Sequence, residues 1–199
     1  MSLSRQSIVL ASNSASRKAM LEGAHVAFEA VGADVDERAL EAEMAGASSG
    51  ELVQALSAAK AAEVSARHSG RLVLGSDSTV EVNGQRFHKP ADRTAAAEHL
   101  RAFSAKTITL HSAAAFARDG KIVWLGDDFA RMQVRALSDE FIAAYLDAEW
   151  PEVAGCVGVF RIEAAGAHLF ERIVGDQFTI LGMPLLKVLA ALRDEGVLP

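Results

Sequence analysis

Short apolar runs and longer amphipathic segments alternate along the first half of the chain. Apolar runs of three or four residues are typical of buried strands, and amphipathic segments are typical of helices. The expected elements of this half are strand 8–11, helix 16–22, strand 28–31, helix 48–67, strand 72–74 and helix 94–103. Ser48 and Glu51 have the spacing of a capping box at the start of the Ala-rich helix. The segment 72–74 is a compact strand core that runs directly into Gly75-Ser76-Asp77.

Two turn sequences in the middle of the chain predict β-hairpins. Asn83-Gly84 and Asp119-Gly120 are each flanked by strand-like residues, and both dipeptides favour the backbone conformation of a tight hairpin. The remaining expected elements are strands 107–117, 122–134 and 156–162, a helix from 138 to about 147 and a closing helix 184–193. Because hairpins interrupt a strand–helix alternation, the pattern predicts an α/β fold with a mixed β-sheet flanked by helices. We expect one domain over residues 1–199, with two lobes around a cleft.

Composition and charge narrow the class of protein. Half of the 199 residues are hydrophobic and 23% are charged, so the chain can bury a sizeable core. A net charge of −6 argues against binding a nucleic acid polymer, although a local group of cations can still hold a small anion. No apolar run approaches the length of a membrane span, and the first eleven residues do not resemble a signal peptide. We therefore expect a cytoplasmic protein without a membrane partner. A single cysteine, Cys156, excludes an intrachain disulfide and a Cys-based zinc site.

The segment between the first expected strand and helix has the composition of an anion-binding loop. It reads Ser12-Asn13-Ser14-Ala15-Ser16-Arg17-Lys18. Unpaired N–H groups and the helix dipole attract anions at a helix start, and hydroxyls with a guanidinium complete such a site. The same serines can be ordinary helix caps, and Arg17 an ordinary surface charge. The glycine spacing of a P-loop is absent.

Three further groups carry candidate chemistry. Asp77 follows an apolar strand and a glycine, where α/β enzymes often place reactive groups, although it could merely stabilise a turn. The acidic set Asp34, Asp36 and Glu37 offers the oxygen ligands that Mg²⁺ or Mn²⁺ require, yet most short acidic clusters are solvated loops. Lys60 and Lys89 are cations that could bind phosphate or lie at the surface.

Taken together, these segments resemble the Maf family of nucleoside triphosphate pyrophosphatases, in the right order and over nearly the whole chain. Each match is short, and it is their collinearity that is specific. The matching pieces are Leu10 to Lys18, Val35-Asp36-Glu37, Lys60-Ala61, Gly75 to Ser78, Lys89-Pro90, Tyr145, Ala154-Gly155 with Gly158, Gly175-Asp176 and Leu181 to Leu185.

The resemblance implies a fold like that of the inosine triphosphate pyrophosphatases and hydrolysis of nucleoside triphosphates to monophosphates and pyrophosphate, as house-cleaning of non-standard or surplus nucleotides. It also implies a divalent cation, Mg²⁺ or Mn²⁺, and often a homodimer. Asp77 matches the catalytic carboxylate, as base or metal ligand, and Glu37 an acidic position near the metal. The residues that match the triphosphate-binding positions are Ser12, Arg17, Lys60 and Lys89.

The chain departs from the family pattern at three positions that the resemblance links to base specificity: Ser16, Ser78 and Arg161. Subgroups that prefer thymidine and uridine triphosphates, or 7-methylguanosine triphosphate, differ at these positions, and this chain fits neither. Two alternatives stay open, and the departures motivate the first of them. One is a nucleotide-binding regulator with the same fold and little turnover, and the other is an interaction module without a ligand.

Overall fold

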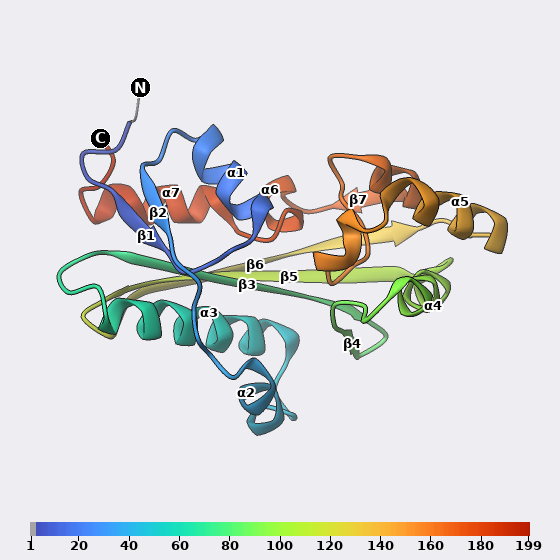
Figure 1. Ribbon diagram of the computed structural model, residues 1–199, viewed down its shortest axis with the longest axis horizontal. Helices are drawn as coiled ribbons and strands as arrows, with labels where there is room; N and C mark the ends of the chain where they lie inside the picture. The colour runs from blue at the N-terminus through green and yellow to red at the C-terminus, as the bar shows by residue number, and fades with distance from the viewer. Residues whose placement is uncertain (1–2) are drawn as a thin grey trace. The chain divides into compact units, whose positions relative to one another are not determined.

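The computed structural model describes residues 3–199 as a mixed β-sheet with helices (Figure 1). Its elements in chain order are β1 (Ile8–Leu10), α1 (Ala15–Gly23), β2 (Phe28–Ala30), α2 (Glu37–Glu43), α3 (Ser49–Ala66), β3 (Val73–Val82), β4 (Gln85–Phe87), α4 (Arg93–Phe103), β5 (Thr107–Arg118), β6 (Lys121–Val134), α5 (Asp139–Glu149), η1 (Glu152–Gly155), η2 (Ala165–Leu169), β7 (Phe170–Val174), α6 (Gln177–Ile180) and α7 (Leu185–Asp194). The labels η1 and η2 denote short 3₁₀ helices.

The seven strands follow the order β2-β1-β3-β5-β6-β7, and β4 pairs with β3. Strand β1 is parallel to both β2 and β3, whereas the β3–β4 and β6–β7 pairs are antiparallel. The prediction of a mixed sheet flanked by helices is therefore confirmed. None of the helices in residues 3–199 is both long and apolar enough to cross a bilayer.

The chain divides into two compact units. The first comprises Ser112–Asp128, Gln177–Pro199 and the described part of Met1–Ser78, and the second comprises Thr79–His111 and Phe129–Asp176. Strands β3, β5 and β6 each contribute residues to both units. The sequence-based expectation of one domain with two lobes around a cleft stays a prediction.

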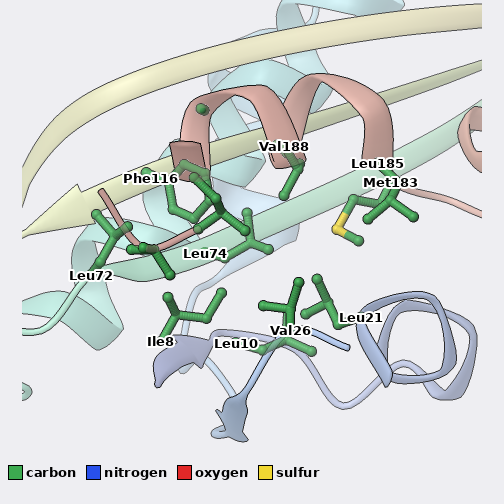
Figure 2. Packing of buried hydrophobic residues seen from close by; sticks show 14 of the residues in the cluster. Ile8, Leu10, Leu21, Val26, Leu72, Leu74, Phe116, Met183, Leu185 and Val188 are labelled. Carbon is green, nitrogen blue, oxygen red and sulfur yellow. The ribbon is translucent and has the colours of Figure 1, made fainter. Parts of the chain in front are cut away.

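In the first unit, helices cover both faces of the strands, because successive side chains of a strand point to opposite faces. Ile8, Leu10 and Leu74 pack with α1 and α7, whereas Val9 and Val73 pack with Val64 of α3. Figure 1 shows α3 on the opposite side of the strands from α1 and α7. Figure 2 shows side chains of β1, β3, α1 and α7 meeting in the larger cluster. This two-sided burial explains why these strands read as continuous apolar runs.

The second unit is organised around α4 and α5. Two ion pairs join these helices, Arg93 with Asp147 and Arg101 with Asp139, the latter at 2.7 Å between Nε and Oδ1. Antiparallel pairing of β3 with β4 is closed by Asn83 and Gly84, which have φ values of 51° and 81°. Positive φ at both central residues is what this type of hairpin turn requires, so the predicted hairpin is confirmed.

Strand β3 extends beyond the expected core at 72–74 and continues through Asp77 to Val82. The polar residue Ser76 fits inside the strand because its buried hydroxyl donates to the carbonyl oxygens of Ala113 (2.7 Å) and Gly182 (3.1 Å). The neighbouring strand β1 ends at Leu10, opposite Leu74. Asp77 therefore lies within a strand, yet beyond the carboxyl end of the parallel strand beside it.

The expected strand at 156–162 is wrong, because this segment follows η1 as turns. Val159 has φ 55°, a left-handed conformation that a strand does not contain, and its carbonyl oxygen accepts a hydrogen bond from the Tyr145 hydroxyl (3.0 Å). The last strand is instead β7, in which no residue is buried. Hydrophobic periodicity could not indicate it, because this strand has no buried face.

Candidate active site

The loop after β1 leads into helix α1, and the two together supply two buried polar side chains, Ser12 and Arg17. Ser14 caps the helix, since its hydroxyl accepts from the Arg17 backbone N–H (3.5 Å). The Ser12 hydroxyl accepts from the Ser14 N–H (3.2 Å). Ser12 and Arg17 are each 8% exposed, so Arg17 is not an ordinary surface charge. Ser16, the second residue of α1, is half-buried.

Arg17 ties three segments of the first unit together through its guanidinium. Nε donates to the Gly182 carbonyl (2.9 Å), Nη1 to the Ser12 hydroxyl (3.3 Å) and Nη2 to the Ser78 hydroxyl (3.3 Å). A guanidinium has five N–H donors, so these bonds leave two for a ligand. Gly182 has φ 101°, a conformation that favours glycine.

Burial lowers the pKa of the Arg17 guanidinium from its ordinary value, and the negative charges of Asp77 and Glu37 oppose that shift. An arginine remains protonated at neutral pH even after a considerable decrease in its pKa. The side chain therefore brings a permanent positive charge into the interior, close to both carboxylates.

Lys60 lies between those two carboxylates. Its Nζ is 2.5 Å from Oδ1 of Asp77 and 2.8 Å from Oε1 of Glu37. The Lys60 and Asp77 side chains are only 12% and 14% exposed, whereas Glu37 is 50% exposed. Helix α3 holds Lys60 in place because the helix is anchored on either side of it. Ala61 is fully buried, and the Ser57 hydroxyl donates to the Ala113 carbonyl (3.0 Å).

Glu37 reaches Lys60 because the segment before α2 is tied down along α3. Asp36 caps α2 by accepting from the Ala39 N–H (3.0 Å). One turn beyond Lys60, Glu63 accepts from the Asp34 N–H (3.1 Å). One turn further, Arg67 donates to the Gly32 carbonyl (2.8 Å) and pairs with Glu63 at 2.8 Å.

We call residues 32–37 together with their three partners on α3 the α3 latch; the partners are Lys60, Glu63 and Arg67. The spacing 60, 63, 67 places these partners on one helix face. Sequence reasoning singled out Lys60 alone, although this spacing was a signal that could have identified the other two.

Of the three acidic candidates, only Glu37 joins Asp77 at the Lys60 ammonium. Among residues 3–199, no group of three or more His, Cys, Asp and Glu side chains is arranged to hold a metal ion. The ligands that the protein itself can offer to a cation at Lys60 are the carboxylates of Asp77 and Glu37. Mg²⁺ is commonly bound through one or two carboxylates together with substrate phosphates and water, so this donor set fits a cation that arrives with a phosphate ligand.

Two of the predicted site residues, Lys89 and Arg161, belong to the second unit. Arg161 is held by Glu149, with Nε 2.9 Å from Oε2, and the Glu149 side chain is only 6% exposed. Glu149 also accepts from the Ala165 N–H (3.3 Å). Burial raises the pKa of the Cys156 thiol, and the nearby charges of Arg161 and Lys89 oppose that shift. Sequence reasoning did not anticipate Glu149 as the partner of Arg161.

The structure thus gathers most of the predicted residues in one place in the first unit. These residues are Ser12, Arg17, Glu37, Lys60, Asp77 and Ser78. Two positive groups, two carboxylates and two hydroxyls beyond the end of a parallel strand define an α/β protein with polar side chains gathered where such folds commonly bind ligands. Such a set can hold phosphate oxygens and place a carboxylate beside them.

Comparison with known proteins agrees with this class. The family model described as Maf-like protein matches residues 7–195, and the chain belongs to this family. It is 46% identical over 191 residues to a nucleoside triphosphate pyrophosphatase of Nitrobacter hamburgensis, covering 96% of this chain and 95% of the relative. It is 47% identical over 195 residues to a 7-methyl-GTP pyrophosphatase of Mesorhizobium japonicum, covering 97% and 98%.

Among solved structures, the chain is similar to a nucleoside-triphosphatase / dITP/XTP pyrophosphatase from Mycobacterium abscessus. The likeness has a TM-score of 0.39 at 20% identity and covers 65% of this chain and 73% of that one. A likeness of that size does not define the fold, which rests here on the strand order and pairing.

Proposed function

We propose that this protein hydrolyses nucleoside triphosphates to nucleoside monophosphates and pyrophosphate. The observation that carries the proposal is the meeting of Arg17, Lys60 and Asp77 in one unit, with the Lys60 ammonium 2.5 Å from the Asp77 carboxylate. The names of two relatives, nucleoside triphosphate pyrophosphatase and 7-methyl-GTP pyrophosphatase, support this substrate class. Such substrates occur in the cytoplasm, where we propose that the enzyme acts.

In the proposed reaction, Arg17 and Lys60 bind the triphosphate and Asp77 acts on water. The Lys60 ammonium and the two remaining N–H groups of Arg17 offset the negative charge that builds up on the phosphates in the transition state. Asp77 orients a water molecule and accepts its proton as the oxygen bonds to the α-phosphorus. The bond from that phosphorus to the oxygen bridging to the β-phosphorus breaks, and pyrophosphate leaves with the bridging oxygen.

A divalent cation, Mg²⁺ or Mn²⁺, completes the proposal. Asp77 and Glu37 would hold it, because both carboxylates contact the Lys60 ammonium. When bound, such an ion neutralises phosphate charge and polarises the phosphoryl oxygens. Contact of Lys89 with the triphosphate, and of Ser16, Ser78 and Arg161 with the base, stays a prediction of the family resemblance.

The test is pyrophosphate release from a panel of nucleoside triphosphates that includes 7-methyl-GTP, with Mg²⁺ or Mn²⁺. We expect release from at least one member, and loss of about a hundredfold or more in kcat for Asp77→Asn. Asp194→Asn, the same change at an exposed position of α7, is the matched control and should keep full activity. No release from any member by a folded sample would overturn the proposal. Tight nucleotide binding without release would indicate a regulator instead.

A further inference from the structure

The Lys60 ammonium lies at the point toward which both candidate metal ligands face. It is 2.5 Å from Asp77 and 2.8 Å from Glu37, so one nitrogen bridges the two carboxylates. The side chain is 12% exposed, and its position on α3 is fixed by the buried neighbours Ser57 and Ala61. Lys60 is therefore part of the interior arrangement, and its charge neutralises two acids at once.

A divalent cation held by Asp77 and Glu37 would share both carboxylates with the Lys60 ammonium. Mg²⁺ bonds oxygen at about 2.0–2.1 Å, which requires it to approach both groups more closely than the ammonium does. Two positive charges beside the same pair of carboxylates repel each other strongly in a half-buried site. Lys60 and the cation therefore exclude each other from the position between Asp77 and Glu37.

The charge balance of the free protein points the same way. Arg17 and Lys60 contribute two positive charges, and Asp77 and Glu37 contribute two negative charges. Without a ligand the group is neutral, so it has little net attraction for a cation. An incoming triphosphate offers the Lys60 ammonium other oxygens to bond. When the ammonium leaves, the two carboxylates keep a net negative charge and their oxygens become available to a cation.

We infer that Lys60 occupies the cation position in the nucleotide-free protein and leaves it when a triphosphate binds. This inference rests on the proposed function, whose metal ligands it uses. Its consequence is that the free protein binds Mg²⁺ or Mn²⁺ poorly and that nucleotide and cation strengthen each other's binding. Linkage requires the two factors of strengthening to be equal. The exchange also releases Asp77 from its ion pair when the substrate is present.

The experiment measures Mn²⁺ affinity of the full chain by electron paramagnetic resonance or calorimetry, without nucleotide. Lys60→Met removes the ammonium and keeps an unbranched side chain. We expect this variant to bind Mn²⁺ about tenfold or more tightly than the wild type. Lys187→Met is the matched control, because Lys187 is an exposed lysine of the same unit that contacts Asp127 and Asp128 instead. It should bind Mn²⁺ as the wild type does.

Two further measurements keep the inference falsifiable. Adding Glu37→Gln to the Lys60→Met variant should abolish the gain in Mn²⁺ affinity. In the wild type, a nucleotide analogue with a non-hydrolysable α,β-bridge should raise Mn²⁺ affinity, and Mn²⁺ should raise analogue affinity by the same factor. If Lys60→Met does not fold, Lys60→Gln takes its place.

Equal Mn²⁺ affinities of the wild type and the folded Lys60 variant would overturn the inference, and so would a gain that survives Glu37→Gln. None of these measurements needs turnover. A protein that gains Mn²⁺ affinity without Lys60 but releases no pyrophosphate would therefore retain the ion exchange and lose the proposed function.

Discussion

The backbone of Gly75 passes so close to helix α3 that a Cβ atom built on it would lie 2.3 Å from the carbonyl oxygen of Ser57. The same atom would lie 2.6 Å from the backbone nitrogen of Ala61. Ser57 and Ala61 flank Lys60 on α3, and Asp77 lies two residues after Gly75 on β3. The missing side chain therefore sets the distance between the two elements that carry the Lys60–Asp77 ion pair.

Gly75→Ala should separate α3 from β3, because the clashing atoms belong to backbone and cannot turn aside. We expect a loss of about 1–3 kcal/mol in the free energy of unfolding, which is typical of overpacking. We also expect a decrease of about tenfold or more in kcat, since small displacements of reacting groups are costly. Denaturant unfolding and pyrophosphate release measure the two effects. Gly46→Ala is the control, because a Cβ there meets nothing within 4 Å; equal behaviour of the two variants would contradict this account.

The α3 latch predicts a role for Glu63 in cation use. Its carboxylate accepts from the Asp34 N–H and pairs with Arg67, which itself donates to Gly32. Glu63→Gln weakens this attachment, so the segment that carries Glu37 becomes less well fixed. We expect the Mn²⁺ concentration for half-maximal activity to rise about three- to tenfold, while the KM for nucleotide at saturating Mn²⁺ and the thermal stability change little.

Glu29→Gln provides the matched control for Glu63→Gln. Glu29 also pairs with an arginine of the first unit, with Oε2 2.5 Å from Nη1 of Arg71, but it lies on β2 and not in the latch. This variant should keep the Mn²⁺ requirement of the wild type. A Mn²⁺ requirement that stays unchanged in Glu63→Gln, or that rises equally in both variants, would show that the latch does not position Glu37.

The contrast between Asp77 and its surroundings shows what the sequence could and could not predict. Asp77 and Arg17 were candidates because each follows an apolar strand, and Lys60 because it is a cation that could bind phosphate. Structural alternatives stayed open for each of them, and the collinear motifs favoured the functional interpretation. The continuation of β3 through Asp77 was not predictable, because it depends on the partners that Ser76 finds at Ala113 and Gly182. Those partners are remote in sequence, so no local pattern contains them.

The longer helices and the hairpins were predicted well because their signals are local, whereas the short helices α2 and α6 were not predicted. The Ser48 capping box and the Asn83-Gly84 turn occur where the sequence indicated them. The segment around Val159 was mistaken for a strand, because its apolar residues are buried in a left-handed turn stabilised by the Tyr145 hydroxyl. Burial without periodicity looks the same in a turn and in a short buried strand.

Arg161 and Glu149 predict a pair of stability effects in the second unit. Removing the guanidinium by Arg161→Gln leaves the buried Glu149 carboxylate without its cation. We expect a loss of about 1–3 kcal/mol in the free energy of unfolding, the usual cost of an unsatisfied buried polar group. The double variant Glu149→Gln with Arg161→Gln should recover most of this loss, because no buried charge remains. Denaturant unfolding of the wild type, the two single variants and the double variant distinguishes this outcome from simple additivity, which would contradict it.

The last prediction concerns pH and the stability of the second unit. His99 packs beside the rings of Phe87 and Phe103, with centroid distances of 5.1 and 6.2 Å. Its Nδ1 is buried and has no hydrogen-bond partner within residues 3–199. Burial lowers the pKa of His99 from its ordinary value; the neighbouring charge of His88 acts in the same direction, and that of Glu98 opposes it.

The native state therefore binds this proton less readily than the unfolded chain, in which histidine titrates near pH 6.5, so protonation favours unfolding. The stability that neutral His99 contributes is present above about pH 6.5 and is lost as the pH falls toward the lower pKa of the folded state. Thermal unfolding between pH 8 and pH 5 should show a smaller decrease in Tm for His99→Leu than for the wild type. His168→Leu, at an exposed histidine of the same unit, should follow the wild type. The variant has no group at this position to titrate. If its Tm and that of the wild type decrease equally between pH 8 and pH 5, protonation of His99 does not destabilise the protein.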